Sequence, residues 1–200
     1  MNTKEKHKVE SSSPLERLGE ASVYIVLLRG INVSGKNKLP MIDLRKILNG
    51  LGYQNVQTYI QSGNIILESN ESKNIICKNI KDAILEKFGY DVPVIAKTIP
   101  EWEKAIEEYP FSKDYEKIVA FTFLDKISEI KELEIKNIGT DKFKINNDVV
   151  YIYCPNGFGK SKITNDLFEK KLKVTATTRN LRTTLKLLEL AHPNLPKGKE

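Results

Sequence analysis

Two hydrophobic patterns alternate along this chain, and together they predict a regular succession of strands and helices. Consecutive apolar residues, as in VYIVLL, are typical of a strand buried on both faces. Apolar residues spaced three to four positions apart, as in residues 41–51, indicate an amphipathic helix. From residue 22 onwards, the patterns predict strands at 22–29, 56–60, 64–69 and 92–97, with helices around 41–51 and 76–88.

The same order of elements returns in the second part of the chain, after a short predicted helix around Trp102. Asp125 is a predicted N-cap for a helix that carries Ile127, Ile130 and Leu133. The other predicted elements are strands at 117–124, 142–145, 149–154 and 173–177 and helices at 160–171 and 181–188.

This order, βαββαβ twice over, predicts an α+β fold of two tandem ferredoxin-like units with an extra C-terminal helix. The duplication is one of pattern, without a residue-level repeat. We place the first unit at 22–108, a linker at 109–116 and the second unit at 117–192. Residues 1–21 are expected to form a disordered tail and residues 193–200 a flexible one.

Composition narrows the class of protein. No apolar run approaches the roughly 18 residues of a membrane span, and the N-terminus lacks the apolar core of a secretory signal. Cys77 and Cys154 have no metal-ligand spacing, which favours a reducing, cytoplasmic location. The two histidines, His7 and His192, are poorly placed for catalysis, so we expect no His-based catalytic unit and no metal site.

The chain is basic, with 32 Lys and Arg against 26 Asp and Glu and a net charge of +6. Because the lysines are interleaved with acidic residues, this excess supports nucleic-acid binding only weakly.

The stretch GINVSGKN, Gly30 to Asn37, matches the phosphate-binding P-loop pattern at every fixed position but the last. In a P-loop the lysine stands at the start of the helix. Here Pro40 favours a helix that begins only after Lys36 and Asn37, which leaves both in the loop. We therefore predict that the stretch is not a P-loop, although its glycines and cations still suit a binding loop.

The predicted topology gathers polar loop residues at particular edges of the two sheets. In the first unit, strands one and two run parallel, so the loops that follow them open at the same edge. The residues placed there, which suit a phosphate or carboxylate, are Arg29, Asn32, Lys36, Asn37, Gln61, Ser62 and Asn64. In the second unit, the loops after strands three and four would gather Asn156, Lys160, Ser161, Thr177, Thr178, Arg179 and Asn180. If the two edges pack together, both clusters line one cleft.

Each of these features also has a structural interpretation. The glycines suit turns, Arg29 suits a helix C-terminus or a carboxylate, and Thr177 or Thr178 suits the N-cap of the last helix. A set of alternating aromatic residues suits either stacking on RNA bases or core packing between the units. Core packing is the simpler explanation, because it needs no ligand. The members of this set are Phe121, Phe123, Tyr151 and Tyr153.

Three stretches in this order, LLRGINVSGKNKL, TYIQSGNIILES and TTRN, make the chain resemble the bacterial domain-of-unknown-function family numbered 1697. The resemblance extends over about 23–191 and includes GFGKSKITNDLFEKKL. It implies a cytoplasmic bacterial protein with a duplicated α/β architecture whose activity is not established. The chain departs from the family pattern in two motifs: Ser34 stands where a glycine is common, and the last motif continues Leu181-Arg182-Thr183 where the family has Trp-Asn-Thr. If that tryptophan stacks on a ligand in relatives, Leu181 cannot do the same.

From the sequence, the leading hypothesis is a protein that binds an anionic, phosphorylated small ligand at these edges. Arg29, Lys36, Lys160 and Arg179 would supply charge-assisted hydrogen bonds. A nucleic-acid-binding protein and an interaction module without a small ligand stay open as alternatives. The sequence assigns no cofactor, catalytic residue or oligomeric state. If the protein is an enzyme, phosphoryl or acyl transfer by positioning and electrostatics suits it best.

Overall fold

The computed structural model describes residues 21–33, 35–111 and 118–192. The predicted tails at 1–20 and 193–200 and most of the predicted linker lie outside these residues. The described chain is a mixed α/β structure with two four-stranded antiparallel sheets and five α-helices.

The first sheet has the strand order β2-β3-β1-β4. Its central strand, β1, is buried over most of its length and pairs antiparallel with both β3 and β4. Two helices, α1 and α2, follow β1 and β3 along the chain. The elements are β1 (Ser22–Leu28), α1 (Met41–Gly50), β2 (Gln54–Tyr59), β3 (Asn64–Ser69), α2 (Lys73–Phe88) and β4 (Val94–Thr98).

The second sheet has the equivalent order, β6-β7-β5-β8, with β5 paired antiparallel to β7 and β8. A helix, α3, precedes it and another, α5, follows it. The elements are α3 (Ile99–Glu107), β5 (Val119–Leu124), β6 (Lys142–Asn146), β7 (Val149–Tyr153), α4 (Asn165–Leu172), β8 (Ala176–Asn180) and α5 (Leu181–Ala191).

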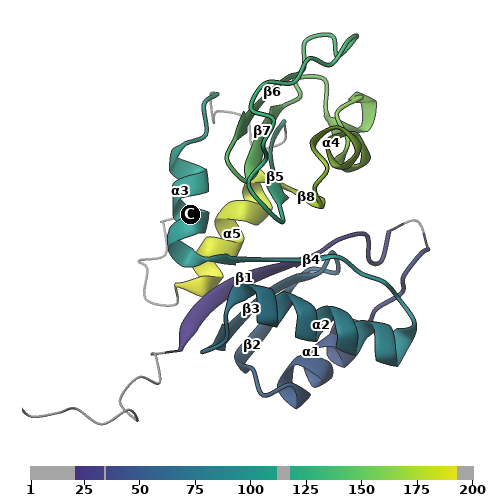
Figure 1. Ribbon diagram of the computed structural model, residues 1–200, viewed down its shortest axis with the longest axis vertical. Coiled ribbons are helices and arrows are strands. Elements are labelled where there is room, and N and C mark those ends of the chain that lie inside the picture. The colour runs from purple at the N-terminus through teal and green to yellow at the C-terminus, as the bar shows by residue number, and fades with distance from the viewer. Residues whose placement is uncertain (1–20, 34, 112–117, 193–200) are drawn as a thin grey trace, which may run out of the picture.

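The two sheets lie on either side of α3 and α5 (Figure 1). A central apolar cluster fills this layer, and in it the Trp102 ring of α3 stacks on Phe123 of β5 with ring centroids 4.2 Å apart. A second cluster lies between the first sheet and α1 and α2. A third lies between the second sheet and α4. Each sheet is thus covered on both faces, as the continuous apolar runs predicted.

The predicted helix at 125–133 is wrong, because the structure has no helix between β5 and β6. Asp125, the predicted N-cap, instead accepts a hydrogen bond from the Thr175 backbone N–H (2.9 Å). Ser128 bonds through its hydroxyl to the backbone of Ile130, a local bond that competes with helix formation. Ile127 is 64% exposed, so the apolar spacing that suggested a helix face does not mark a buried one.

Among the boundaries that differ from the prediction, two affect the candidate site. The helix expected from residue 160 begins at Asn165, where the Thr164 hydroxyl accepts from the Leu167 N–H, and residues 158–160 form a short 3₁₀ turn. The last strand runs on to Asn180, so the TTRN stretch lies inside β8 and not after it. Within the described ranges, no helix is long and apolar enough to cross a membrane.

Candidate functional site

The loop after β1 folds into a small hairpin. Val33 and Lys36 pair across it, with a hydrogen bond from the Lys36 N–H to the Val33 carbonyl (3.0 Å). The Asn37 side chain donates to the Gly30 carbonyl (3.1 Å) and closes the base of the hairpin. Asn32 and Asn37 both have positive φ angles, which asparagine tolerates better than most residues.

The Asn32 side chain joins this loop to the turn between β2 and β3. Its amide nitrogen donates to the carbonyls of Leu39 and Gln61, both at 2.9 Å, and its oxygen accepts from the Leu39 N–H (2.8 Å). The convergence of the two loops, predicted from the sheet topology, is therefore present in the structure. We call these two segments, of which the structure describes residues 29–33, 35–38 and 59–64, the paired loops.

The turn between β2 and β3 depends on Gly63 and Asn64. Gly63 has φ +74°, and a Cβ built there would lie 2.6 Å from the Leu28 Cβ. The Leu28 N–H donates to the Gly63 carbonyl (2.8 Å) in this close approach. Asn64 is fully buried and donates to the Tyr59 carbonyl and the Ser62 hydroxyl. Ile60, a β-branched residue, is held at φ 47° with half of its surface exposed.

The hairpin does not have the geometry of a P-loop. Lys36 and Asn37 precede α1, which begins at Met41 with Pro40 as its N-cap. The lysine is therefore not at a helix N-terminus, where a P-loop would place its phosphate. The prediction that GINVSGKN is not a P-loop is confirmed in this respect.

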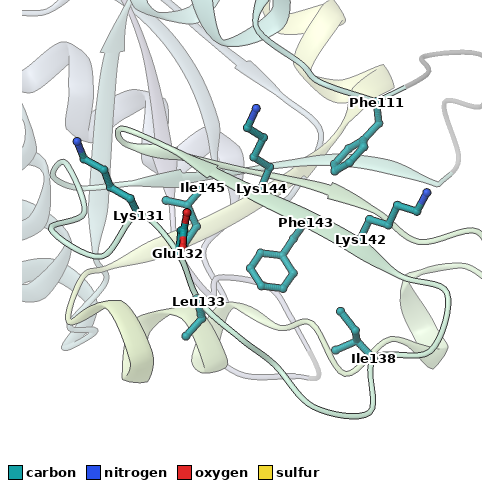
Figure 2. A pocket seen from close by; sticks show the side chains of 9 residues that line it. All are labelled: Phe111, Lys131, Glu132, Leu133, Ile138, Lys142, Phe143, Lys144 and Ile145. Atoms are coloured by element: carbon teal, nitrogen blue, oxygen red, sulfur yellow. The ribbon is translucent and has the colours of Figure 1, made fainter.

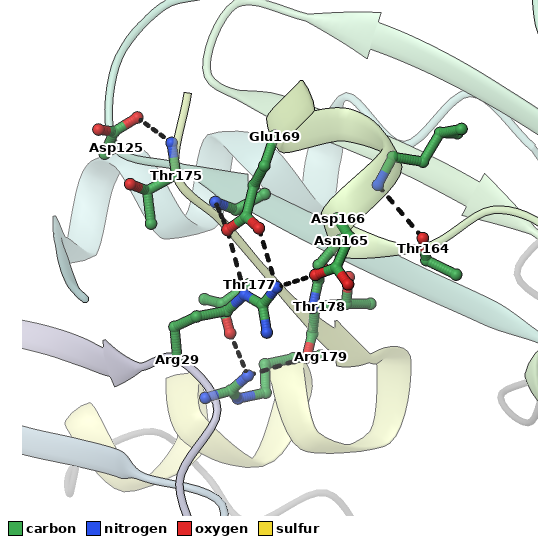
Figure 3. Close-up of polar contacts among 12 residues, drawn as sticks. Arg29, Asp125, Thr164, Asn165, Asp166, Glu169, Thr175, Thr177, Thr178 and Arg179 are labelled. Atoms are coloured by element: carbon green, nitrogen blue, oxygen red, sulfur yellow. Dashed lines mark hydrogen bonds and ion pairs between the residues drawn. The ribbon is translucent and has the colours of Figure 1, made fainter. Parts of the chain in front are cut away.

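Arg179 of β8 lies beneath the paired loops and links the two sheets. Figure 3 shows this side chain beside Thr177 and Thr178. Its Nε donates to the Asn64 side-chain oxygen. Its Nη2 donates to the carbonyls of Leu28 (3.1 Å) and Ser62 (3.0 Å). Its Nη1 donates to the Thr177 hydroxyl (2.8 Å) and the Thr178 carbonyl (2.9 Å). A guanidinium has five N–H donors, so each one has a partner here.

None of these five acceptors carries a charge, and the Arg179 side chain is almost completely buried. Burial lowers the pKa of the guanidinium to about 10, because the surroundings disfavour the charged form. The group nevertheless stays protonated at neutral pH. The structure thus holds a buried positive charge below the surface of the paired loops.

Arg29 crosses the same junction in the opposite direction, from the end of β1 to α4 (Figure 3). Its Nε and Nη2 form a two-pronged contact with the Glu169 carboxylate at 3.1 and 2.8 Å, and Nη2 also contacts Asp166. The hydrogen bond to Glu169 raises the pKa of Arg29 most, against a smaller lowering by burial. The structural interpretation of Arg29 as a partner of carboxylates is confirmed.

The other predicted site residues of the second sheet separate into two places. The Thr178 hydroxyl contacts Thr122 and donates to the Asn165 side chain (2.6 Å). Asn180, and neither threonine, is the N-cap of α5 and accepts from the Thr183 N–H (2.8 Å). Lys160 instead lines a pocket with residues 137–141, and Ser161 accepts from the Ile163 N–H. The structure brings Arg29, Arg179 and the paired loops together, but it places Lys160 against a different loop.

The aromatic residues of the second sheet belong to the core. Phe121, Phe123 and Tyr151 are at most 1% exposed and lie beneath α3 and α5. Tyr109 packs on Phe121 and on Tyr151 and donates to the Ile152 carbonyl (3.1 Å). The core-packing interpretation is therefore confirmed for Phe121, Phe123 and Tyr151, whose rings are not accessible to nucleic-acid bases. Tyr153, the fourth residue of the predicted set, is half-buried and packs against the same cluster.

Glu169 and Asp166, the carboxylates that pair with Arg29, were not among the residues singled out from the sequence. Glu169 lies 140 positions from Arg29, and its only local signal is a three-residue spacing from Asp166 on α4. The ion pair between Lys97 and Asp148 also joins the two sheets, and its lysine is only 5% exposed. Within the described part of the chain, no group of three or more potential metal-ligating side chains is present.

Fold and junction together define an α/β protein whose two antiparallel sheets are joined through buried polar contacts. The family model described as "Protein of unknown function (DUF1697)" matches residues 22–151, and the chain belongs to this family. A similar solved structure is that of the conserved bacterial protein SP0830 from Streptococcus pneumoniae. It is 24% identical, has a TM-score of 0.66, and the alignment covers 86% of this chain and 99% of that one. No curated protein matches the chain.

Proposed function

We propose that this protein binds an anionic, phosphorylated small molecule on the paired loops. The observation that carries the proposal is the buried guanidinium of Arg179, which lies against the carbonyls of Leu28 and Ser62 and has only neutral partners. A charge in a weakly polarisable interior is screened far less than one in water, so its field reaches the surface above it.

The charges around Arg179 leave the paired loops positive. Arg29 and Glu169 neutralise one another, and Asp166 is 87% exposed, so water screens it strongly. The stretch from Arg29 to Ile42 contains no acidic residue, and neither does the turn at 59–64. Lys36 and Lys38 are both exposed on the hairpin. An anion on this surface therefore meets cations without a competing carboxylate from the loops themselves.

The polar groups of the paired loops have two different roles in this proposal. Asn32, Asn37 and Asn64 use their amides to hold the loops in place. The groups proposed to contact the ligand are Lys36, the exposed Gln61 and the Ser62 hydroxyl. Arg179 acts from below, through its field and through its bonds to Leu28 and Ser62. Lys160 would require a second site, because it lines a pocket with the 137–141 loop, and the Ser161 hydroxyl is bonded to the Ile163 N–H.

The proposal includes a structural part: the two sheets are two related ferredoxin-like units. The equivalent strand orders, β2-β3-β1-β4 and β6-β7-β5-β8, support it. The second unit lacks a helix at the position of α1, so the relation extends to the strands and to the second crossover of each unit.

Thermal unfolding with a panel of anions tests the binding site. The panel contains inorganic pyrophosphate, nucleotides and sugar phosphates, each with the wild-type protein, Lys36→Ala and Gln61→Ala. A ligand at 100 times its dissociation constant should stabilise the wild type by about 2.7 kcal/mol and raise its midpoint by several degrees. Both variants should lose most of that shift while melting normally without ligand. Lys170→Ala, an exposed lysine on α4, is the matched control and should keep it.

Two outcomes would contradict the proposal. Absence of a shift with every anion would leave the paired loops as scaffold. An equal shift in Lys36→Ala, Gln61→Ala and the control would place the ligand elsewhere. Binding of RNA or DNA with affinity that falls steeply with salt would favour the nucleic-acid alternative.

A further inference from the structure

A groove lies along the outer edge of the second sheet (Figure 2). This edge is formed by β6, whereas Arg179 and its contacts to the paired loops belong to β8 at the opposite edge. Its volume is about 640 Å³. Lysine and apolar side chains dominate its lining, which consists of Phe111, Lys131, Glu132, Leu133, Ile138, Lys142, Phe143, Lys144 and Ile145. Four of these residues belong to β6, the first strand in the order of its sheet.

Among the residues that the structure describes, the backbone of β6 pairs with one strand only, β7. Asn146 and Val149 flank a two-residue turn, so they form a hydrogen-bonded pair, and such pairs alternate along an antiparallel hairpin. Lys144 and Lys142 therefore bond to β7, whereas the backbone groups of Phe143 and Ile145 point to the free edge. These groups are available to an added strand.

The two faces of β6 differ sharply in chemistry. Phe143 and Ile145 turn toward the third apolar cluster, in which Leu133 and Ile138 also pack. Lys142 and Lys144 are exposed on the opposite face. No ion pair joins Lys131, Lys142 or Lys144 to another described residue. A strand added at this edge would meet apolar side chains on one face and Lys142 and Lys144, without ion-pair partners, on the other; Glu132 is the single acidic residue of the lining.

We propose that the β6 groove binds an extended, acidic segment of another protein by strand addition. Such a segment alternates apolar and acidic residues, because side chains on a strand alternate between faces. Two other occupants, the ends of this chain and a second copy of it, are disfavoured by their charge. The chain's own ends carry no negative excess: residues 1–20 have four Lys and Arg against four Glu, and residues 193–200 have two Lys against one Glu. A second copy paired through its own β6 would place lysines against lysines.

A peptide-binding experiment on the full chain tests this proposal. The probe is a fluorescent peptide of about seven residues that alternates glutamate and valine, followed by fluorescence anisotropy. We expect saturable binding that weakens about tenfold in the double variant Lys142→Glu, Lys144→Glu. The matched control, Lys170→Glu with Lys171→Glu, makes the same change of charge on exposed positions of α4 and should bind normally.

Two further probes separate strand addition from charge attraction. The same peptide, N-methylated at alternate residues, cannot pair with the edge and should lose its binding. A peptide alternating lysine and valine should not bind the wild type, but should bind the Lys142→Glu, Lys144→Glu variant. The proposal is overturned if the glutamate–valine peptide fails to bind or if N-methylation has no effect. Equally strong binding of the lysine–valine peptide, or equally effective competition by single-stranded RNA, would overturn it as well. None of these outcomes depends on the paired loops.

Discussion

The junction between the two sheets has a buried side and an exposed side, and each is built around one arginine. On the buried side, Arg179 meets five neutral acceptors, including the backbone of Leu28 and Ser62. On the exposed side, Arg29 meets the carboxylates of Glu169 and Asp166, and its side chain is 23% exposed. One arginine has no charged partner, and the other has two.

A count of ion pairs would rank the exposed side as the stronger. Burial reverses that ranking, because an exposed pair contributes little while an unsatisfied buried acceptor costs its full desolvation. Arg179 supplies the donors for the buried Asn64 side chain and the Leu28 carbonyl, so it holds the sheets together through hydrogen bonds and not through charge pairing. Substitutions on the two sides should therefore differ in size, in salt dependence and in their response to conservative replacement.

Arg179→Met should have the largest effect, a loss of about 4 kcal/mol in the free energy of unfolding. It leaves the Leu28 and Ser62 carbonyls and the Asn64 oxygen without donors. Arg179→Lys should be no milder, because an ammonium brings the same buried charge with too few donors in the wrong directions. Urea denaturation measures both. A Lys variant with wild-type stability would show that charge, and not the set of hydrogen bonds, is what the junction needs.

Gly63→Ala should come next, with a loss of about 3 kcal/mol, and it tests the same buried side through the backbone. The added Cβ would lie 2.6 Å from the Leu28 Cβ and 2.9 Å from the Ile31 Cδ1, at φ +74°. Gly35→Ala is the matched control, since Gly35 has φ +76° with nothing within 4 Å. It should cost about 1 kcal/mol, which is the conformational penalty alone. Equal losses in the two variants would mean that packing under the turn is loose.

Arg29→Ala should cost less, about 1 to 2 kcal/mol, although it removes two ion pairs at once. Its partner Glu169 keeps a second bond, from the Ala176 N–H (3.0 Å), so the carboxylate is not left unsatisfied. A double-mutant cycle with Glu169→Gln should give a coupling of about 1 kcal/mol that shrinks in high salt. A coupling of zero would show that the two-pronged contact between Arg29 and Glu169 contributes nothing to the free energy of unfolding.

The contrast between the sides also explains what could be read from the sequence. The strand at 64–69 was predicted with its observed bounds, because the consecutive apolar residues Ile65, Ile66 and Leu67 indicate a buried strand. The meeting of the loops around Asn32 and Gln61 followed from sheet topology alone. Both inferences use information local to the chain or imposed by strand direction.

The contacts that cross the junction were beyond such reasoning. Nothing near Arg179 indicates that β8 continues through it and presents its side chain to residues 115 and 151 positions away. The missing helix at 125–133 has the same origin: Asp125 and Ser128 bond to Thr175 and Asn147, partners that the local periodicity could not reveal. Polar residues whose local sequence suggests a cap or a ligand contact instead form hydrogen bonds with residues that are distant in the sequence.

Asp166→Asn should have the smallest effect, about 0.5 kcal/mol or less, because Asp166 is 87% exposed. The side chain also lies in the first turn of α4, where a carboxylate favours the helix by a similar amount. A simple loss of stability therefore does not identify its cause. Measured again in the Arg29→Ala background, the same substitution separates the two: a cost that persists belongs to the helix, and one that disappears belongs to the ion pair. We expect most of it to persist, since only on the buried side of the junction is water kept away from the arginine.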